Sequence, residues 1–272
     1  MNEDKDRKRW SIRSFRRWLE RKQYSENTTS SYTRDASMFC KAVNSNVRYS
    51  SFLKYRNEEL STLPPSTANR KVFALNHFME YLKIHRKKLN CFKIQKKHFM
   101  DDNKLLELKD VKKLLKTADE YSPTAAALIR VLAYTGIRVG ELMFMTVENA
   151  KLGYATIWNK GKFRKILIPR QASEAIQKFA EYKGITKGGV FARTTNAARE
   201  ILKKTAKLAG VSEKKVFPHN FRHFFAIQFL QNTRDLPALG NILGHSSLNT
   251  TAIYTMQTAS SVRQKIEAAI AI

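Results

Sequence analysis

The chain has 272 residues and carries 50 Lys and Arg against 23 Asp and Glu, which gives a formal charge of +27. A compact body with that charge repels itself unless a polyanion neutralises it, so we expect nucleic acid as the partner. No apolar run approaches the ~20 residues that span a bilayer, and residues 1–9 are charged with no apolar segment behind them, which argues against a membrane anchor and a signal peptide.

Helical periodicity dominates the first part of the chain. Apolar side chains recur at helical spacing in two stripes, namely Ile12, Phe15 and Leu19, then Tyr32, Ala36, Phe39, Cys40 and Val43. Residues 51–60 could form a short third helix. A fourth helix should follow the break at Pro64 and Pro65, with Ser66 as its N-cap. These elements predict a small four-helix bundle.

The fourth predicted helix has two faces of different character. Its apolar face carries Val72, Leu75, Met79 and Leu82. Its other face carries Arg70, Lys71 and Lys83, which we expect to be exposed. Arg70 and Lys71 are therefore candidates for contact with a DNA groove or phosphate.

Between residues 85 and 103 the helical pattern dissolves into basic and polar side chains. This composition is typical of an exposed linker that can lie along a phosphate backbone. We therefore predict a helical domain over residues 1–90, a basic linker over 91–103 and a second domain over 104–272. A solvated charge run inside a single domain is the alternative.

The second domain is predicted to be mostly helical with a small sheet. Residues 154–158 and 166–168 have strand character, and the Gly161 region between them indicates a hairpin loop over 159–165. Gly136 should end a helix as a left-handed C-cap. Helices are predicted at 109–118, 124–134, 138–145, 172–182, 196–209, 220–230, 236–243 and 249–255 and from 262 onward. The fold class is thus mainly α with a small β-sheet.

Four short segments concentrate polar residues that could carry chemistry. They lie at 135–142, 159–162, 218–223 and 243–247, and Tyr254 follows nine residues after His245. Each taken alone has an ordinary structural explanation: an arginine paired with an acid, solvated lysines on a hairpin tip, a capped helix end or a core tyrosine.

Taken together, the segments resemble the tyrosine recombinase family of the phage-integrase type. The likeness lies in the order Arg, Lys, His-x-x-Arg, Gly-His and a trailing Tyr, and it is nearly continuous over 218–223, 243–247 and 251–255. It covers the second domain, which would be the catalytic domain. It extends more weakly to the first, whose four helices look like the family's core-binding domain. Little room precedes Trp10 for a third domain, so the chain resembles the compact two-domain Xer-like branch.

The resemblance assigns the phosphate chemistry to four residues. Tyr254 would attack the phosphorus and form a 3′-phosphotyrosyl link, while Arg138 and Arg222 clamp the phosphate and Glu141 supports Arg138. Elementary chemistry agrees, because guanidinium forks bind non-bridging oxygens bidentately and stay charged throughout. Two arginines can thereby replace the metal ions of many phosphoryl-transfer sites.

The resemblance assigns the proton transfers to two further residues and a hydrogen bond to a third. Lys160 would protonate the leaving 5′ oxygen, His219 would exchange a proton near the tyrosine, and His245 would donate a hydrogen bond to the phosphate. Lys162 is the alternative to Lys160, because it could reach the same oxygen if the hairpin folded differently. Turn position favours Lys160, which directly precedes Gly161. Lys162 would then be a DNA-contact residue.

No cofactor is predicted. The sequence contains no P-loop and no D-x-[DN] cluster that would hold a catalytic metal, and its two cysteines, Cys40 and Cys91, form no C-x-x-C pair. The energy of the cleaved bond would be stored in the phosphotyrosine, so we expect neither ATP nor metal to be needed.

The resemblance also implies partners. The family acts on double-stranded DNA at specific recombination sites, as a tetramer that passes through a four-way (Holliday) junction, sometimes with a related recombinase or an accessory protein. The helix from 262 would dock on a neighbouring protomer, or else pack on its own domain. We expect a cytoplasmic, nucleoid-associated protein that acts in integration, excision or resolution.

Three other functions compete with this interpretation. A DNA-binding protein without chemistry shares the charge and the helices but gives no reason for the spacing of His245 and Tyr254. A type IB topoisomerase resembles the same catalytic set but would need no exchanging tail. A metal-dependent nuclease lacks its carboxylate cluster here.

Overall fold

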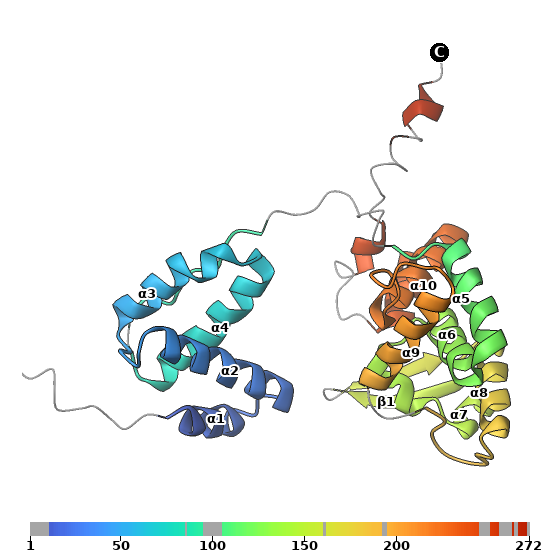
Figure 1. Cartoon of the computed structure of the whole chain (residues 1–272), viewed down its shortest axis with the longest axis horizontal. Coiled ribbons are helices and arrows are strands. Elements are labelled where there is room, and N and C mark those ends of the chain that lie inside the picture. Colours follow the sequence, from blue (N-terminus) through green and yellow to red (C-terminus); the bar gives the residue numbers. More distant parts are fainter. Residues whose placement is uncertain are drawn as a thin grey trace, which may run out of the picture. The chain divides into compact units, whose positions relative to one another are not determined.

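The computed structural model describes residues 11–84, 86–94, 105–159, 162–191, 195–244, 251–255, 263 and 266–270. The chain divides into two compact units, Met1–Lys96 and Lys97–Ile272. The described residues are mostly helical with one two-stranded sheet, which confirms the predicted fold class (Figure 1). None of the described helices is long and apolar enough to cross a membrane.

The first unit is built from helices whose starts are encoded locally. Its elements are α1 (Ile12–Arg21), α2 (Glu26–Ala42), α3 (Tyr49–Glu58), the 3₁₀ turn η1 (Leu60–Thr62) and α4 (Pro65–Tyr81). Ser11 and Ser25 cap α1 and α2, because their hydroxyls accept hydrogen bonds from backbone N–H groups of the first turns. The predicted stripes are buried in one core, where Phe15, Phe39 and Phe78 are fully enclosed.

The start of α4 differs from the prediction. Pro65 is the first helical residue and Pro64 is the N-cap, so Ser66 lies inside the helix and does not cap it. Proline suits the first helical position, because its fixed φ fits the helix and its missing N–H needs no partner there. The helix therefore begins two residues earlier than a cap at Ser66 would allow.

Residues 86–94 pack on the first unit, although the sequence predicts an exposed linker that starts within them. The Asn69 side chain accepts a hydrogen bond from the Phe92 N–H at 2.7 Å and donates one to its carbonyl at 3.0 Å. Asn76 holds Leu89 in the same way, at 2.8 and 3.1 Å. Leu89 is buried and Phe92 packs against the core. The predicted linker therefore begins too early, and its residues 95–103 lie outside the described residues.

The second unit is a helical body with a hairpin. Its elements are α5 (Leu108–Tyr121), α6 (Pro123–Thr135), the 3₁₀ helix η3 (Val139–Phe144), α7 (Val147–Leu152), β1 (Tyr154–Asn159), β2 (Lys162–Leu167), α8 (Arg170–Tyr182), α9 (Thr195–Leu208), α10 (Pro218–Thr233), α11 (Leu236–Leu243) and the 3₁₀ turn η4 (Ala252–Thr255). Two predicted α-helices, 138–145 and the described part of 249–255, are thus largely 3₁₀ segments, and the six-residue α7 was not predicted.

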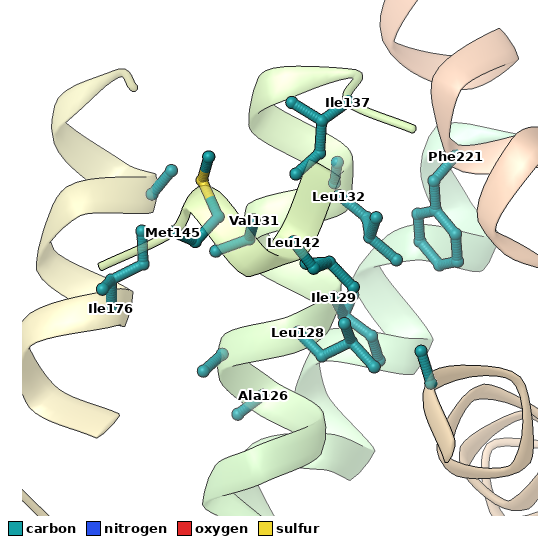
Figure 2. Packing of buried hydrophobic residues seen from close by; sticks show 14 of the residues in the cluster. Ala126, Leu128, Ile129, Val131, Leu132, Ile137, Leu142, Met145, Ile176 and Phe221 are labelled. Carbon is teal, nitrogen blue, oxygen red and sulfur yellow. The ribbon is translucent and has the colours of Figure 1, made fainter. Parts of the chain in front are cut away.

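The core of this unit surrounds α6. Most residues of that helix are buried, and Arg130 and Tyr134 lie on its more exposed side. Figure 2 shows Leu128, Val131 and Leu132 of α6 among side chains from flanking elements, including Ile176 of α8 and Phe221 of α10. Packing therefore holds the C-terminal end of α6 in place, and the loop that follows it carries Arg138.

The hairpin is tighter than predicted. β1 and β2 pair antiparallel with Asn159 opposite Lys162, so only residues 160 and 161 connect them. The predicted loop over 159–165 is wrong, because residues 162–165 belong to β2. Their charged side chains hide the strand signal, which rests on apolar alternation.

Candidate active site

The turn after α6 creates the backbone frame of the site. Gly136 ends α6 in the left-handed conformation with φ of 60°, as predicted. Glycine is needed there for two reasons: the conformation disfavours other residues, and a Cβ would collide with the Phe225 ring. The turn directs the Gly136 carbonyl toward α10 and brings Arg138 to the start of η3.

Arg138 is held by Glu141, as the sequence predicts. One Glu141 oxygen accepts a hydrogen bond from the Arg138 backbone N–H at 2.9 Å, and the other lies 3.2 Å from Arg138 Nη1. Glu141 is buried, whereas 46% of the Arg138 side chain is exposed. The carboxylate therefore anchors a guanidinium that remains open to a ligand.

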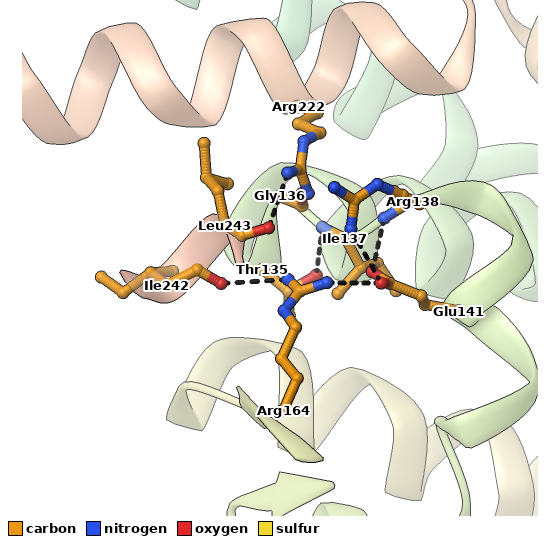
Figure 3. A network of polar contacts seen from close by, with 9 residues as sticks. All are labelled: Thr135, Gly136, Ile137, Arg138, Glu141, Arg164, Arg222, Ile242 and Leu243. Atoms are coloured by element: carbon orange, nitrogen blue, oxygen red, sulfur yellow. Dashed lines mark hydrogen bonds and ion pairs between the residues drawn. The ribbon is translucent and has the colours of Figure 1, made fainter. Parts of the chain in front are cut away.

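Arg222 is the largest fully buried side chain of the described residues. Its Nη1 donates to the Gly136 carbonyl at 2.8 Å, and its Nη2 donates to the Leu243 carbonyl at 2.7 Å (Figure 3). Burial and then the charge of Arg138 lower the pKa of Arg222, while the charge of Tyr254 and a hydrogen bond with that residue act in the opposite direction. An arginine stays protonated despite such a shift.

Tyr254 lies against the arginine site. It is 5% exposed and packs on Ala226, Leu239 and Leu243. A hydrogen bond joins its side chain to Arg222, so the phenol and the buried guanidinium are in direct contact. Tyr254 therefore lies beside Arg222 in a single protomer.

Two histidines on α10 complete the described part of the site. The His219 and His223 rings are 4.7 Å apart between centroids, and the Tyr254 ring follows 5.2 Å beyond His223. Burial, then the charges of Arg222 and Arg138, lower the pKa of His219. Burial, then the charges of His219 and Arg222, lower the pKa of His223 to about 4. Since both shifts disfavour the charged forms, both imidazoles are neutral at pH 7.

Arg164 of β2 was missed by the sequence analysis. Its Nη1 forms an ion pair with Glu141, and its Nη2 donates to the Ile242 carbonyl at 3.0 Å (Figure 3). Burial lowers the pKa of Arg164, the charge of Glu141 raises it and that of Arg138 lowers it. The available signal was strand alternation, because residues 164, 166 and 168 would share one face of a strand extended toward the turn.

The structure brings together Arg138, Glu141, His219, Arg222 and Tyr254 of the predicted set. Lys160 and His245 lie outside the described residues. Lys162 is placed on β2 by its backbone, and its side chain is not described. The Arg138 and Arg164 guanidinium groups bind the one carboxylate of Glu141, and their charges also act on Arg222, so the site has an excess of positive charge that suits an anionic ligand. Among the described residues, no group of three or more His, Cys, Asp or Glu side chains could hold a metal ion.

The candidate DNA-contact residues of the first unit have a structural partner. Arg70 Nη1 forms an ion pair with Asp35 and donates to the Ser31 hydroxyl at 2.6 Å. Lys71 Nζ lies 3.3 Å from the Asp35 carboxylate. The expectation that Lys71 is exposed is wrong, because it is only 9% exposed and its side chain extends from α4 to Asp35 of α2. Arg70, whose side chain is 40% exposed, retains access to solvent.

Comparison with known proteins identifies the family. The profile of the Phage integrase family matches residues 104–261. Tyrosine recombinase XerD of Listeria monocytogenes is 30% identical over 224 residues, which are 71% of this chain and 72% of XerD.

Two solved structures share the fold. One is a lambda integrase dimer bound to a COC′ core site, with a TM-score of 0.67, 16% identity and coverage of 89% of this chain and 93% of that chain. The other is XerH recombinase bound to difH substrate, with a TM-score of 0.65, 20% identity and coverage of 90% and 79%. The family match over the unit that holds the arginine site establishes that the chain belongs to the phage integrase family of tyrosine recombinases, the enzymes of site-specific DNA recombination.

Proposed function

We propose that this chain cleaves and rejoins DNA at specific sites by transferring a DNA phosphate to Tyr254. The observation that carries the proposal is the contact between Tyr254 and the buried Arg222, within a cluster of arginines that exceeds its one carboxylate in charge. A phenol in that position is within reach of any phosphate that the arginines bind. Family membership supports the same conclusion.

The arginines divide the work on the phosphate. Arg138, half exposed and fixed by Glu141, presents free N–H donors to a non-bridging oxygen. Arg222 is fixed by the Gly136 and Leu243 carbonyls, so its charge is in place before the ligand arrives. Because the donors are already oriented, they stabilise the additional negative charge of the five-coordinate phosphorus without reorganisation.

The transfer makes one bond and breaks one. The Tyr254 oxygen attacks phosphorus, the bond from phosphorus to the 5′ oxygen breaks, and a 3′-phosphotyrosine remains. We assign the acceptance of the phenolic proton to His219, whose lowered pKa keeps the imidazole neutral and able to accept it. The described ring contact of Tyr254 is with the neighbouring His223. Lys160 gives a proton to the 5′ oxygen, and His245 donates a hydrogen bond to the phosphate. Rejoining reverses these steps with a different 5′ hydroxyl, so no nucleotide hydrolysis is needed.

The partners follow from the same proposal. The ligand is double-stranded DNA, on which the first unit acts as the clamping domain and the chain assembles as a homo-tetramer through a Holliday junction. A related recombinase or accessory protein could join it. Residues 263 and 266–269 are helical, and we assign this tail to contact with a neighbouring protomer. The place of action would be the nucleoid.

Trapping of the covalent intermediate tests the proposal. The protein is incubated without metal on nicked duplexes from the DNA that flanks its own coding sequence, so that the cleaved strand end is lost and rejoining is prevented. We expect a protein–DNA band that survives denaturation. Tyr254→Phe should abolish it, because the nucleophilic oxygen is gone, whereas Tyr182→Phe on the exposed surface of α8 should preserve it.

Two results would contradict the proposal. A band that persists in Tyr254→Phe would place the nucleophile elsewhere, and tight binding to these duplexes without any band would favour a non-catalytic DNA-binding protein. Recombinant products from paired sites, rather than relaxed plasmid alone, separate recombination from topoisomerase activity.

A further inference from the structure

Arg164 occupies a position in β2 where an apolar side chain would be expected. It stands opposite Ile157 of β1, and Ala155, Ile157 and Ile166 on the same face of the hairpin are buried. Only 13% of the Arg164 side chain is exposed. Burying a charged group in such a position destabilises the fold unless ion pairs and hydrogen bonds compensate the lost hydration. The partners of Arg164 therefore indicate its role.

The guanidinium of Arg164 joins three separate segments. Nη1 pairs with Glu141, which also binds Arg138 at the start of η3. Nη2 donates to the carbonyl of Ile242 at 3.0 Å, in the last turn of α11. The next carbonyl along α11, that of Leu243, is held by Arg222. Figure 3 shows the two guanidinium groups binding successive carbonyls of this helix end. The hairpin, the Arg138 loop and the α11 end thus share one anchor.

Gly244 confirms how closely Arg164 is fitted. This glycine ends α11 with φ of 63°, and a Cβ at its position would overlap the Arg164 side chain. Both the backbone conformation and the space therefore require glycine immediately before His245. The glycine of the Gly-His motif thus leaves space for the Arg164 side chain beside the end of α11.

The opposite face of the hairpin offers no comparable attachment. Trp158 and Phe163 are 61% and 75% exposed, and their rings contact each other at 4.4 Å between centroids. Lys165, on the same outer face, lies over the Tyr154 ring. Among the described side chains near the turn, Arg164 is therefore the polar group that ties β2 to the body of the unit. Only two residues, Lys160 and Gly161, separate the paired residues Asn159 and Lys162.

We infer that Arg164 is a positioning residue: it fixes β2 against Glu141 and the α11 end, and the proton donation proposed for Lys160, two residues before β2 begins, depends on that attachment. The inference rests on the proposed function, because it assigns a reason for the placement of the proton donor in that reaction. Arg164 itself does not touch the DNA phosphate. Its loss should therefore impair proton donation more than phosphate binding.

The leaving group provides a way to separate the two effects. When the bond from phosphorus to the 5′ oxygen breaks, that oxygen must take the ammonium proton, because an alkoxide is a strongly basic leaving group. If sulfur replaces the 5′ oxygen, the phosphorus–sulfur bond breaks to give a thiolate, whose conjugate acid has a pKa of about 8.5 and which leaves unprotonated. A defect confined to proton donation should disappear on the 5′-phosphorothiolate DNA.

The experiment measures single-turnover formation of the covalent adduct on matched oxygen and sulfur substrates. Arg164→Lys retains a charge but cannot bind Glu141 and the Ile242 carbonyl together. We expect it to cleave the oxygen substrate about 100-fold more slowly than the unsubstituted protein, and the sulfur substrate within about 3-fold of it. Lys160→Ala should show the same pattern. Lys165→Met, on the outer face, is the matched control and should cleave both substrates normally.

Other outcomes decide against the inference. An equal loss on both substrates would mean that Arg164 acts through Arg138 or through folding, and no loss on either would mean that the anchor is dispensable. The thermal unfolding midpoint of Arg164→Ala, compared with that of the unsubstituted protein, shows whether a slower cleavage results from unfolding. If the alanine variant does not fold, the cleavage rates of Arg164→Lys decide the question. If the unsubstituted protein cleaves neither substrate, the proposed function fails and this inference falls with it, a result distinct from either outcome above.

Discussion

Each unit of the molecule contains a buried carboxylate that binds two cationic side chains. In the first unit, Asp35 of α2 is 2% exposed and holds Arg70 and Lys71 of α4. In the second unit, Glu141 of η3 is 6% exposed and holds Arg138 and Arg164. The residue types and the burial are nearly the same, yet only the second cluster has the features of an active site.

The difference lies in what surrounds the carboxylate. Asp35 joins two helices of one bundle, and its arginine is bound on both arms by Asp35 and by the Ser31 hydroxyl. Near Arg138 lies another guanidinium, that of Arg222, which donates hydrogen bonds to two backbone carbonyls. Carbonyl dipoles fix the orientation of a cation without cancelling its charge. The second cluster therefore remains an anion site, whereas the first is a structural tie.

The largest expected effect comes from exchanging arginine for lysine in both clusters. Arg222→Lys loses the fork that binds two carbonyls and the phosphate at once, so we expect adduct formation to slow by a factor of about 1000. Arg70→Lys keeps a cation beside Asp35, so we expect less than about a 3-fold change. Single-turnover trapping on the nicked duplex measures both rates. Similar losses in the two variants would show that the clusters do not differ in function.

A second test concerns the free energy of unfolding of the first unit. Asp35→Ala leaves Lys71 buried without its counter-ion, which should destabilise the unit by about 3 kcal/mol. Lys71→Met removes the buried ammonium but leaves Asp35 bound to Arg70, so we expect a change of no more than about 1 kcal/mol.

Urea unfolding followed by Trp18 fluorescence measures these changes, in a background where Trp10 and Trp158 are phenylalanine. Trp18 packs on the core of the first unit and so reports on that unit. A loss in Lys71→Met as large as that in Asp35→Ala would mean that Lys71 stabilises the unit by its packing. Trapping activity at a temperature where both variants are folded should be close to that of the unsubstituted chain.

Most helices of the first unit were predictable from the sequence, and the wrong predictions there concern single residues. Apolar periodicity located α1, α2 and α4, since that signal is repeated over several turns. The burial of Lys71 was encoded as well: Ala68 and Leu75, three and four residues away, are both buried, so Lys71 lies on the same face. Residue type alone predicts an exposed lysine, whereas position on the helix predicts a buried one. Asp35, the acid that makes burial of Lys71 tolerable, is far away in sequence, which is why the pair was not anticipated.

In the second unit the sequence predicted the site residues more accurately than the bounds of the helices and strands. Arg138, Glu141 and Arg222 lie in contiguous motifs, and the structure brings them together with Tyr254. Arg164 was missed because the hairpin was expected to open at residue 159, which removed Arg164 from any strand face. Its partners are a carboxylate 23 residues earlier and a carbonyl 78 residues later, and such contacts leave no local pattern.

The smallest expected effect is a dependence of stability on pH that comes from His223. Its ring lies between those of His219 and Tyr254, and burial, then the charges of His219 and Arg222, lower its pKa to about 4. The same imidazole in the unfolded chain titrates near 6.5, at about the ordinary value. Its contribution to stability is therefore complete above pH 6.5 and is lost as the pH falls from 6.5 toward 4, because the unfolded chain takes up a proton that the folded chain refuses.

His223→Phe tests this contribution and shows which unit it stabilises. The substitution keeps a ring against Tyr254 but cannot titrate, so the unfolding free energy should fall less steeply with pH, by at most about 1.4 kcal/mol per pH unit. The change should appear in the transition that Trp158 reports when Trp10 and Trp18 are phenylalanine, and not in the transition that Trp18 reports, since His223 belongs to the second unit. An unchanged slope would mean that the pKa of His223 is the same in the folded and the unfolded chain, which would contradict the prediction. The neutral imidazole that we expect leaves the positive charge of the site on its arginines, which is the feature that distinguishes it from the Asp35 cluster.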